Sequence, residues 1–172
     1  IAVAASNLAR HQNRIRLFEF GKSFHGSLAH HNEIERIAGL VIGPANPEQW
    51  GSKSEPVDFF DIKSDVAALR SLTGDSGEFD YVSATHAALQ PGQTAHLVRD
   101  GQVIGVIGKF HPRLAKHFDL KRDVFLFELD AAAALASTAP VAVPVSRFPA
   151  IRRDISVVVD EKVSADDLVK AV

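Results

Sequence analysis

The chain has 172 residues, of which 46% are hydrophobic and 23% charged, and its formal net charge at pH 7 is −2. These fractions are typical of a folded globular protein and exclude a mainly disordered or collagen-like chain. No apolar run approaches the roughly 20 residues that cross a bilayer, so we expect a cytoplasmic protein with no membrane partner. The absence of cysteine excludes disulfides, thiolate catalysis and cysteine-ligated zinc.

The first half of the chain alternates helical and extended patterns. Residues 1–13 have the apolar spacing of a helix, and residues 15–24 and 34–42 are rich in β-formers, which predicts an antiparallel pair of strands. A loop over residues 44–56 contains the single tryptophan, Trp50. A helix is predicted to begin after Asp58, which is suited to cap it, and to end at Gly74.

The second half predicts further strands around one sharp turn. Strands are expected over residues 79–84, 94–98, 102–107 and 124–129. Asp100-Gly101 indicates a tight hairpin, because both residue types tolerate positive φ. Pro112 favours the start of a short helix that runs to Phe118, and Asp130 is suited to cap residues 131–136. We therefore predict an α+β fold with a mostly antiparallel sheet and flanking helices.

The C-terminal stretch predicts a second domain. Residues 139–145 contain prolines and small residues typical of a linker, residues 155–159 predict a strand, and Ser164 is a good N-cap for a helix. Because that helix is still running at Val172, we expect the chain to be a piece of a longer polypeptide with an incomplete second domain.

A metal site is the first chemistry that the eight histidines suggest. The residues that cluster in sequence are His25, His30, His31, Glu33 and Glu35. Metal ligands must converge at about 2 Å, whereas adjacent residues of a strand point to opposite sides. We interpret this run as a solvated turn before a strand and assign no metal ligand.

Nucleophilic and phosphate-binding sites are also weakly supported. Ser83, Thr85 and His86 lie close in sequence, but no GxSxG pattern surrounds any serine. The glycines of GQVIGVIGK (residues 101–109) lack the spacing of a P-loop, and we interpret them as sites of close backbone packing. We assign no catalytic and no cofactor-binding residue.

The segment around residues 147–153 is the best candidate for RNA contact. Its basic and aromatic side chains suit phosphate contact and base stacking, and the candidates are Arg147, Phe148, Arg152 and Arg153. Across residues 144–172, however, five basic residues meet five acidic ones, so any contact would be a local patch. An interface or structural role, with Asp154 pairing one arginine, remains an equal alternative.

Several segments, in this order, resemble the beta subunit of bacterial phenylalanyl-tRNA synthetase. The segments that carry the resemblance are RLFEFGKSF (16–24), IAGLVIG (37–43), the loop ending at Trp50, VDFFDIKSDV (57–66), ALQPGQTA (88–95), IGVIGKFHP (104–112), VFLFELD (124–130) and SRFPAIRRDISVVVDE (146–161). Two positions depart from the family pattern: Gln90 replaces a histidine and Ser64 a glycine. Neither position is catalytic by resemblance.

The resemblance implies the C-terminal part of that subunit. Residues 1–138 would be a class II synthetase-like core module that is itself non-catalytic, and residues 146–172 the truncated start of a ferredoxin-fold anticodon-binding domain. Phenylalanine–tRNA ligase would use ATP and magnesium in its alpha subunit, within a heterotetramer of two alpha and two beta subunits that charges tRNA(Phe). We expect this chain to hold the alpha subunit and to help place the tRNA.

The residues themselves offer no obvious triphosphate site, because Arg16, Arg36 and Arg99 are scattered and are interpreted as exposed charges of the sheet. Two alternatives from other classes remain. One is a stand-alone α+β enzyme that uses His86 or His111 as acid or base, and the other is an independent RNA-binding module.

Overall fold

The computed structural model describes residues 1–27, 30–51, 53–73, 79–137, 147–149 and 151–171. The chain forms two compact units, residues 1–140 (unit 1) and residues 141–172 (unit 2). None of the helices within the described ranges is long and apolar enough to cross a membrane.

Unit 1 is built on one antiparallel sheet, as the α+β prediction requires. Its six strands are β1 (Ile15–Gly26), β2 (His31–Ile42), β3 (Asp80–Ser83), β4 (Leu89–Arg99), β5 (Gln102–Phe110) and β6 (Val124–Asp130). The order across the sheet is β1-β2-β6-β5-β4-β3, and every neighbouring pair is antiparallel. The predicted pairing of the first two strands is confirmed, and β1 and β3 form the edges.

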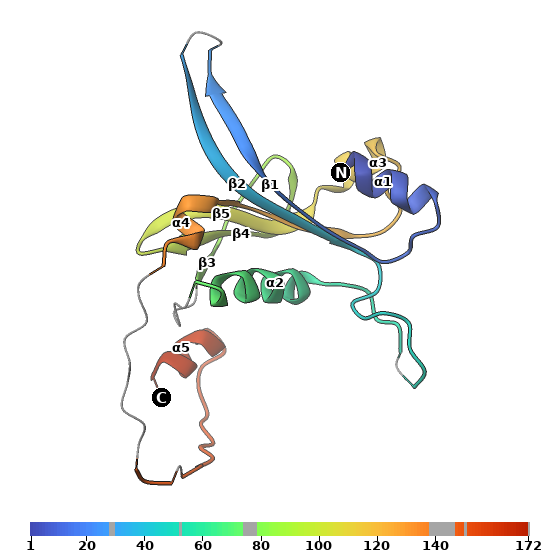
Figure 1. Cartoon of the computed structure of the whole chain (residues 1–172). Helices are drawn as coiled ribbons and strands as arrows, with labels where there is room; N and C mark the ends of the chain where they lie inside the picture. The colour runs from blue at the N-terminus through green and yellow to red at the C-terminus, as the bar shows by residue number, and fades with distance from the viewer. Residues whose placement is uncertain (28–29, 52, 74–78, 138–146, 150, 172) are drawn as a thin grey trace. The chain divides into compact units, whose positions relative to one another are not determined.

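The β1–β2 hairpin extends beyond the sheet as an arm (Figure 1). β1 pairs with β2 along its whole length, but β2 pairs with β6 only from Arg36 to Ile42. The outer halves of both strands therefore have only each other as neighbours. A two-stranded ribbon of this kind has little stability of its own, so the arm depends on the sheet at its base.

Local sequence signals explain where several elements begin and turn. Asp100 and Gly101 both adopt positive φ, 51° and 75°, in the tight β4–β5 turn that was predicted. Helix α2 (Phe59–Ser71) begins with a reciprocal capping box between Asp58 and Asp61. Asp130 caps α4 (Ala131–Leu135) by accepting a hydrogen bond from the amide of Ala133. These start signals are confirmed; Gly74 lies outside the described residues.

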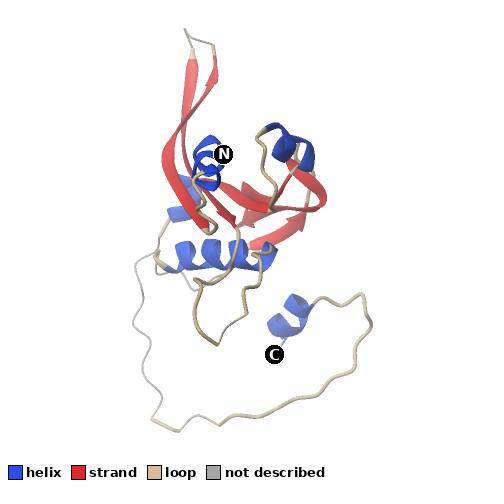
Figure 2. Ribbon diagram, turned by 90° about the vertical axis from the view of Figure 1, so that its right-hand side faces the viewer, coloured by secondary structure: helices blue, strands red, loops and turns tan. Residues whose placement is uncertain are grey.

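Two separate hydrophobic clusters cover the two faces of the sheet. On one face α2 packs through Ile62 and Val66 against the central strands, whose contribution includes Leu129. On the other face α1 (Ala2–Ala9) and α3 (Pro112–His117) share a smaller cluster around Ile42. Figure 2 shows the sheet between α2 and the N-terminal helix. The sheet is therefore covered on both faces, and the cluster on the α2 face is the larger one.

Unit 2 corrects one sequence prediction and confirms another. The strand expected over residues 155–159 is wrong: residues 151–160 form no regular hydrogen-bonded structure, and Ile155 and Val158 are exposed. A strand needs a hydrogen-bonded neighbour, and the described residues of unit 2 provide none. Helix α5 (Ala165–Ala171) is present, and the Asp167 amide donates to Ser164 Oγ at 3.1 Å, as the N-cap prediction expected. The predicted linker at 139–145 lies outside the described residues.

Candidate functional site

An aromatic stripe on edge strand β1 is the most conspicuous exposed apolar feature of unit 1. Its members are Phe18, Phe20 and Phe24, which are 84%, 56% and 63% exposed. Residues two apart in a strand share a face, and Phe18 and Phe20 lie opposite Gly39 and Ile37 of β2. The stripe therefore continues the α2-covered face of the sheet to its open edge, beyond the cover of the helix.

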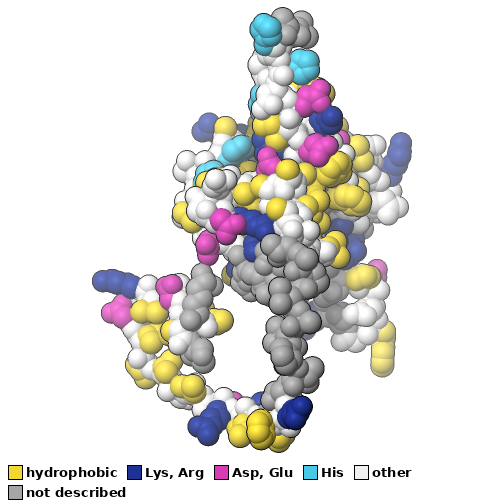
Figure 3. All heavy atoms as spheres, turned by 60° about the vertical axis from the view of Figure 1, so that its left-hand side comes forward, with side chains coloured by type: hydrophobic (Ala, Val, Ile, Leu, Met, Phe, Trp, Pro, Cys, Tyr) yellow, Lys and Arg dark blue, Asp and Glu magenta, His cyan; other side chains and the backbone are white. Residues whose placement is uncertain are grey.

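A groove lies between this stripe and α2. It has a volume of about 270 Å³, with Ile37 and Val41 from β2, Ile62 and Leu69 from α2, and Phe18 among its lining residues. At one end Arg16 and Asp65 form an ion pair between Nη1 and Oδ2 at 2.6 Å, which ties β1 to α2. Figure 3 shows hydrophobic side chains gathered on the surface below the histidine-bearing tip of the molecule. A pocket of this shape, with a charged rim, suits an apolar side chain of a partner.

Gly39 keeps this groove open for a steric reason. A Cβ at this position would meet the ring of Phe127 on the neighbouring strand β6. At Gly39 the groove is therefore lined by backbone and by the ring of Phe127, between the aliphatic side chains of Ile37 and Val41. Aromatic side chains, including phenylalanine, are enriched in protein interfaces relative to the rest of the surface.

The three sheet arginines are less exposed than the sequence suggested. Arg16, Arg36 and Arg99 have side chains only 29%, 26% and 13% exposed. Each is occupied: the partners are the Asp65 carboxylate, the Glu128 carboxylate at 3.9 Å, and the carbonyl oxygen of Ala133, which accepts from Arg99 Nη1 at 2.9 Å. The prediction that they are exposed charges is wrong, because each lies against a neighbouring strand or helix that the sequence alone does not place beside it.

Arg16, Arg36 and Arg99 do not form a triphosphate site. A triphosphate site needs unpaired cations and converging carboxylates. The sheet arginines are already engaged, and within the described ranges no three histidine, aspartate or glutamate side chains group as metal ligands. We therefore assign no nucleotide contact to the three sheet arginines.

The histidines proposed for acid–base chemistry have structural roles. His111 Nδ1 accepts a hydrogen bond from the Arg113 amide at 3.2 Å and so caps α3. His86 Nδ1 accepts from the Ala88 amide, also at 3.2 Å. His86 is exposed and His111 half-buried, and both use a ring nitrogen to close a turn. The normal helix-entry interpretation of His111-Pro112 is confirmed.

The acidic and histidine-rich run at the hairpin tip forms ion pairs rather than a ligand cluster. Lys22 Nζ lies 2.8 Å from Glu33 Oε2, and His31 Nε2 lies 3.6 Å from Glu33 Oε1. The pKa of Glu33 is lowered because Lys22 hydrogen-bonds and attracts its carboxylate, and the pKa of Lys22 is raised by the same contact. Lys22 and Glu33 thus satisfy each other at this end of unit 1.

Two of the three glycines of residues 101–109, Gly105 and Gly108, serve packing as interpreted from the sequence, whereas Gly101 has open space around it and adopts a positive φ in the β4–β5 turn. A Cβ at Gly105 would meet the carbonyl oxygen of Glu128, and one at Gly108 the carbonyl oxygen of Gln93. Lys109 pairs with Asp123 at 2.7 Å. These residues let β5 approach its neighbours closely and make no phosphate loop.

The RNA-contact candidates of unit 2 lie outside helices and strands. Arg147, Arg152 and Arg153 are exposed, and Phe148 is 84% exposed. Nothing in the geometry of this segment brings them to a defined surface. Their role in RNA contact stays a prediction.

A second basic region, which the sequence reasoning missed, occupies the α1–α3 side of unit 1. We call it the basic end, and its members are Arg10, Arg14, Arg113, Lys116, Lys121 and Arg122. All six side chains are exposed. The available signal was the charge of residues 109–123, which carry five lysines and arginines against two aspartates.

Comparison with known proteins identifies the family of unit 1. The family described as "Phenylalanyl tRNA synthetase beta chain CLM domain" matches residues 1–131. The chain is also similar to proteins named phenylalanine–tRNA ligase beta subunit from Shewanella oneidensis (46% identity over 169 residues), Methylococcus capsulatus (45% over 172) and Nitrosococcus oceani (44% over 158). These alignments cover 96%, 98% and 91% of this chain and 21%, 21% and 20% of the relatives. The chain thus spans about a fifth of the length of the curated relatives it matches.

The fold has a more distant likeness as well. The structure of a pyrrolysyl tRNA synthetase from Desulfitobacterium hafniense superimposes with a TM-score of 0.55 at 16% identity, over 78% of this chain and 45% of that one. This likeness concerns the fold alone and agrees with the predicted synthetase-like architecture. The family match over residues 1–131 leads to one conclusion: the chain belongs to the phenylalanyl-tRNA synthetase beta chain family, through its CLM domain.

Proposed function

We propose that the chain is part of the beta subunit of phenylalanine–tRNA ligase and acts as a docking module for the alpha subunit. The single observation that carries this proposal is the aromatic stripe with its adjoining groove, which leaves apolar surface exposed on an otherwise well-packed sheet. Exposed contiguous apolar surface with a charged rim is typical of a protein interface. The names of the relatives, as beta subunits, provide the partner class.

The finer assignment follows the resemblance. Residues 1–138 would form the non-catalytic, class II synthetase-like module of the C-terminal part of the subunit, residues 139–145 a linker, and residues 146–172 the start of a ferredoxin-fold anticodon-binding domain. The whole enzyme would work in the cytoplasm as a heterotetramer of two alpha and two beta subunits, with ATP, magnesium and catalysis in the alpha subunit. The engaged state of Arg16, Arg36 and Arg99 supports a non-catalytic unit 1.

The stripe is suited to a permanent partner for an energetic reason. Each phenylalanine that moves from water into an interface buries a large apolar area, and area removed from water contributes about 25 cal/mol per Å². Strand β1 also offers an unpaired backbone edge along the same surface. A partner that covers the stripe could bury the phenylalanines and also pair with the backbone edge of β1.

Co-elution with purified alpha subunit tests the proposal. We expect the chain at micromolar concentration to elute as a complex with the alpha subunit in size-exclusion chromatography. The variant Phe18→Ser/Phe20→Ser is expected to lose the complex while its thermal unfolding is unchanged, because both side chains are mostly exposed. Val82→Ser/Val103→Ser, which removes exposed valines of β3 and β5 (52% and 60% exposed), is the matched control and should still bind.

Two results would contradict the proposal. One is a folded wild-type chain that does not bind the alpha subunit at all. The other is binding by Phe18→Ser/Phe20→Ser as strong as that of the wild type, which would place the interface away from the stripe. Thermal unfolding of each protein separates both results from misfolding.

A further inference from the structure

The near-neutral charge of the chain hides a strong local asymmetry. Residues 1–14 carry two arginines and no acidic residue, and residues 109–123 carry five basic residues and two aspartates. These two segments together have a formal charge of +5, in a chain whose total is −2. All other residues together are therefore strongly acidic, and the positive potential of the molecule concentrates on these segments.

The fold brings these two segments to the same end of unit 1. Helices α1 and α3 pack into one hydrophobic cluster, α1 through Leu8 and α3 through Leu114. Arg122 ties the segments together directly: its Nη1 and Nη2 donate to the carbonyl oxygen and Oδ1 of Asn13, each at 3.2 Å. The neighbouring Arg14 donates to the carbonyl oxygen of Ala45 at 3.1 Å. The segment after α1 and the segment after α3 thus lie side by side, although about 100 positions separate them in the sequence.

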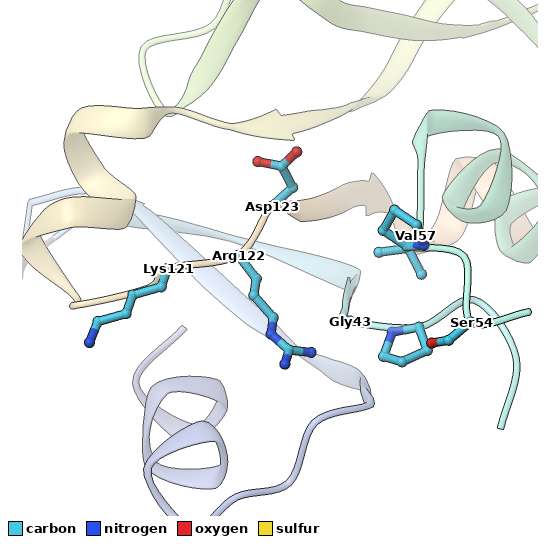
Figure 4. Close-up of a pocket in the computed structure, with 8 residues that line it drawn as sticks. Gly43, Ser54, Val57, Lys121, Arg122 and Asp123 are labelled. Carbon is cyan, nitrogen blue, oxygen red and sulfur yellow. The ribbon is translucent and has the colours of Figure 1, made fainter. Parts of the chain in front are cut away.

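The cations of the basic end are not neutralised. Within the part of the chain that the structure describes, none of its six side chains forms an ion pair with a carboxylate. Asp123, the acidic residue next to Lys121 and Arg122, is instead occupied by Lys109 at 2.7 Å. Figure 4 shows Lys121 and Arg122 extending away from the Asp123 carboxylate. Lys121 is exposed, and Arg122, which is also exposed, is hydrogen-bonded among the described residues only to the uncharged Asn13.

Two hollows flank the segment between α3 and β6 (residues 118–123), which carries Lys121 and Arg122. One, of about 440 Å³, is lined by Gly43, Pro44 and Ser54 from the loop after β2, and the other, of about 280 Å³, by Lys109 and Lys116. Lys121 and Arg122 line both. Asp123 also lines both hollows and Asp119 lines the second, so the cations outnumber the carboxylates in each, by two to one in the first and by four to two in the second.

We propose that the basic end binds the phosphate backbone of RNA. Unpaired lysines and arginines spread over an exposed surface are the electrostatic footprint of a nucleic-acid-binding protein, and their contacts position the nucleic acid without reading its sequence. A protein partner would need an apolar core at this place, whereas Leu114 and Leu120 are packed inside and the exposed apolar side chains, Val3 and Phe118, are outnumbered by the six cations. The inference deepens the proposed function, on which it rests, by giving unit 1 its own RNA-contacting surface.

Salt-dependent binding of a fluorescent tRNA(Phe) transcript to the 172-residue chain is the test. We expect Lys116→Glu/Lys121→Glu to weaken binding at least tenfold at about 0.1 M salt and to reduce the slope of log K against log salt by about two. The side chain of neither lysine makes a hydrogen bond or ion pair in the described structure, and both are exposed, so the fold should remain. Lys116→Gln/Lys121→Gln, which only removes charge, should produce a smaller loss in the same direction.

Two comparison variants locate the effect. Lys53→Glu/Lys63→Glu makes the same change in net charge on the loop before α2 and on α2, and should leave the RNA affinity within about threefold of the wild type, through long-range charge alone. Arg152→Glu/Arg153→Glu tests the unit 2 segment separately. If Arg152→Glu/Arg153→Glu also weakens binding, unit 2 makes a second RNA contact, and the effect of Lys116→Glu/Lys121→Glu remains as expected.

Three results would overturn the inference: a wild-type chain that does not bind tRNA(Phe), an unchanged affinity and salt slope in Lys116→Glu/Lys121→Glu, or an equal loss in Lys53→Glu/Lys63→Glu. Co-elution with the alpha subunit is measured on the same proteins. A basic-end variant that loses the alpha subunit but keeps RNA would identify a protein contact and also contradict the inference. If the wild type binds RNA through the basic end but not the alpha subunit, only the docking proposal fails.

Discussion

The hairpin end and the basic end of unit 1 leave opposite kinds of group exposed. Along the hairpin strand β1 the cations are paired, in Lys22–Glu33 and Arg16–Asp65, while phenylalanines are exposed to solvent. At the basic end Leu8 of α1 and Leu114 of α3 pack into a cluster, while the cations have no carboxylate partner among the described residues. What a surface leaves unsatisfied indicates its partner: apolar area favours a protein, and unpaired positive charge favours a polyanion.

This difference also explains why a chain of nearly zero net charge can serve two kinds of partner. The formal charge of −2 is an average over regions with opposite composition. The two surfaces stand on the same sheet but on its two faces, each with a hydrophobic cluster of its own. They are therefore expected to respond separately to mutation, and the following experiments test that separation.

The largest effect is expected from a residue on which both surfaces depend. Leu129 lies on β6, between β2 and β5, and is fully buried. Leu129→Ala should lower the free energy of unfolding by about 2–5 kcal/mol, because it removes apolar contacts and leaves a cavity. Urea denaturation measures the change. Leu72→Ala, at a position 79% exposed, is the control and should change stability by less than about 0.5 kcal/mol; similar losses in the two variants would contradict the packing described.

Substitution of Gly43 tests the contact between the end of β2 and the segment at Asn13 that holds Arg122. Its φ is +91°, and a Cβ would meet the carbonyl oxygen of Asn13, the residue that holds Arg122. Gly43→Ala should cost about 2 kcal/mol or more, since strain and collision add. Gly51→Ala has a similar φ of +81° but open space around it, so it should cost only about 1 kcal/mol. Equal thermal unfolding of the two variants would exclude the collision.

Removal of the N-cap of α2 tests whether this helix, which lines the groove beside the stripe, contributes to binding of the alpha subunit. Asp58 accepts hydrogen bonds from the amides of Phe60 and Asp61 at 2.7 and 3.1 Å. Asp58→Ala should cost about 1 kcal/mol, and it should weaken alpha-subunit binding without changing RNA binding. Ser64→Ala, at an exposed position of the same helix, is the control for a side-chain change alone. A loss of RNA binding in Asp58→Ala would show that the two surfaces are coupled.

The smallest effect concerns pH at the hairpin tip. The pKa of Glu33 lies below its ordinary 4.5 because Lys22 hydrogen-bonds and attracts the carboxylate. Stabilisation of the arm by this pair is therefore present above pH 4.5 and is lost as the pH falls through the lowered pKa. A carboxyl-carbon NMR titration should place the Glu33 midpoint below 4.5, and Lys22→Ala should return it to about that value. An unchanged midpoint in Lys22→Ala would assign the shift to another group.

Local rules predicted the elements whose signals lie within a few residues. Asp58, Asp130 and Asp100-Gly101 act through hydrogen bonds or φ angles that neighbouring residues determine, and the structure confirms them. The strand expected over residues 155–159 was wrong because a strand also needs a partner, and unit 2 offers none among its described residues. Local patterns specify conformation more readily than pairing.

Neither the aromatic stripe nor the basic end could be predicted from local sequence patterns, for different reasons. The alternation of Phe18 and Phe20 predicts one face of a strand, but their exposure follows from the edge position of β1 in the sheet order, which the local sequence does not encode. The basic end joins Arg14 to residues near Arg122 across about 100 positions, through packing that only the fold reveals. The same holds for Arg16, whose partner Asp65 lies 49 residues away.

Hydrogen exchange on complex formation tests the central comparison most directly. The alpha subunit is added to the chain, and amide exchange is followed by mass spectrometry along residues 15–26 and 113–122. We expect the alpha subunit to slow exchange in residues 15–26, at the edge strand that carries the stripe, and to leave residues 113–122 unchanged. Protection of residues 113–122 without protection of residues 15–26 would contradict the assignment of the two surfaces.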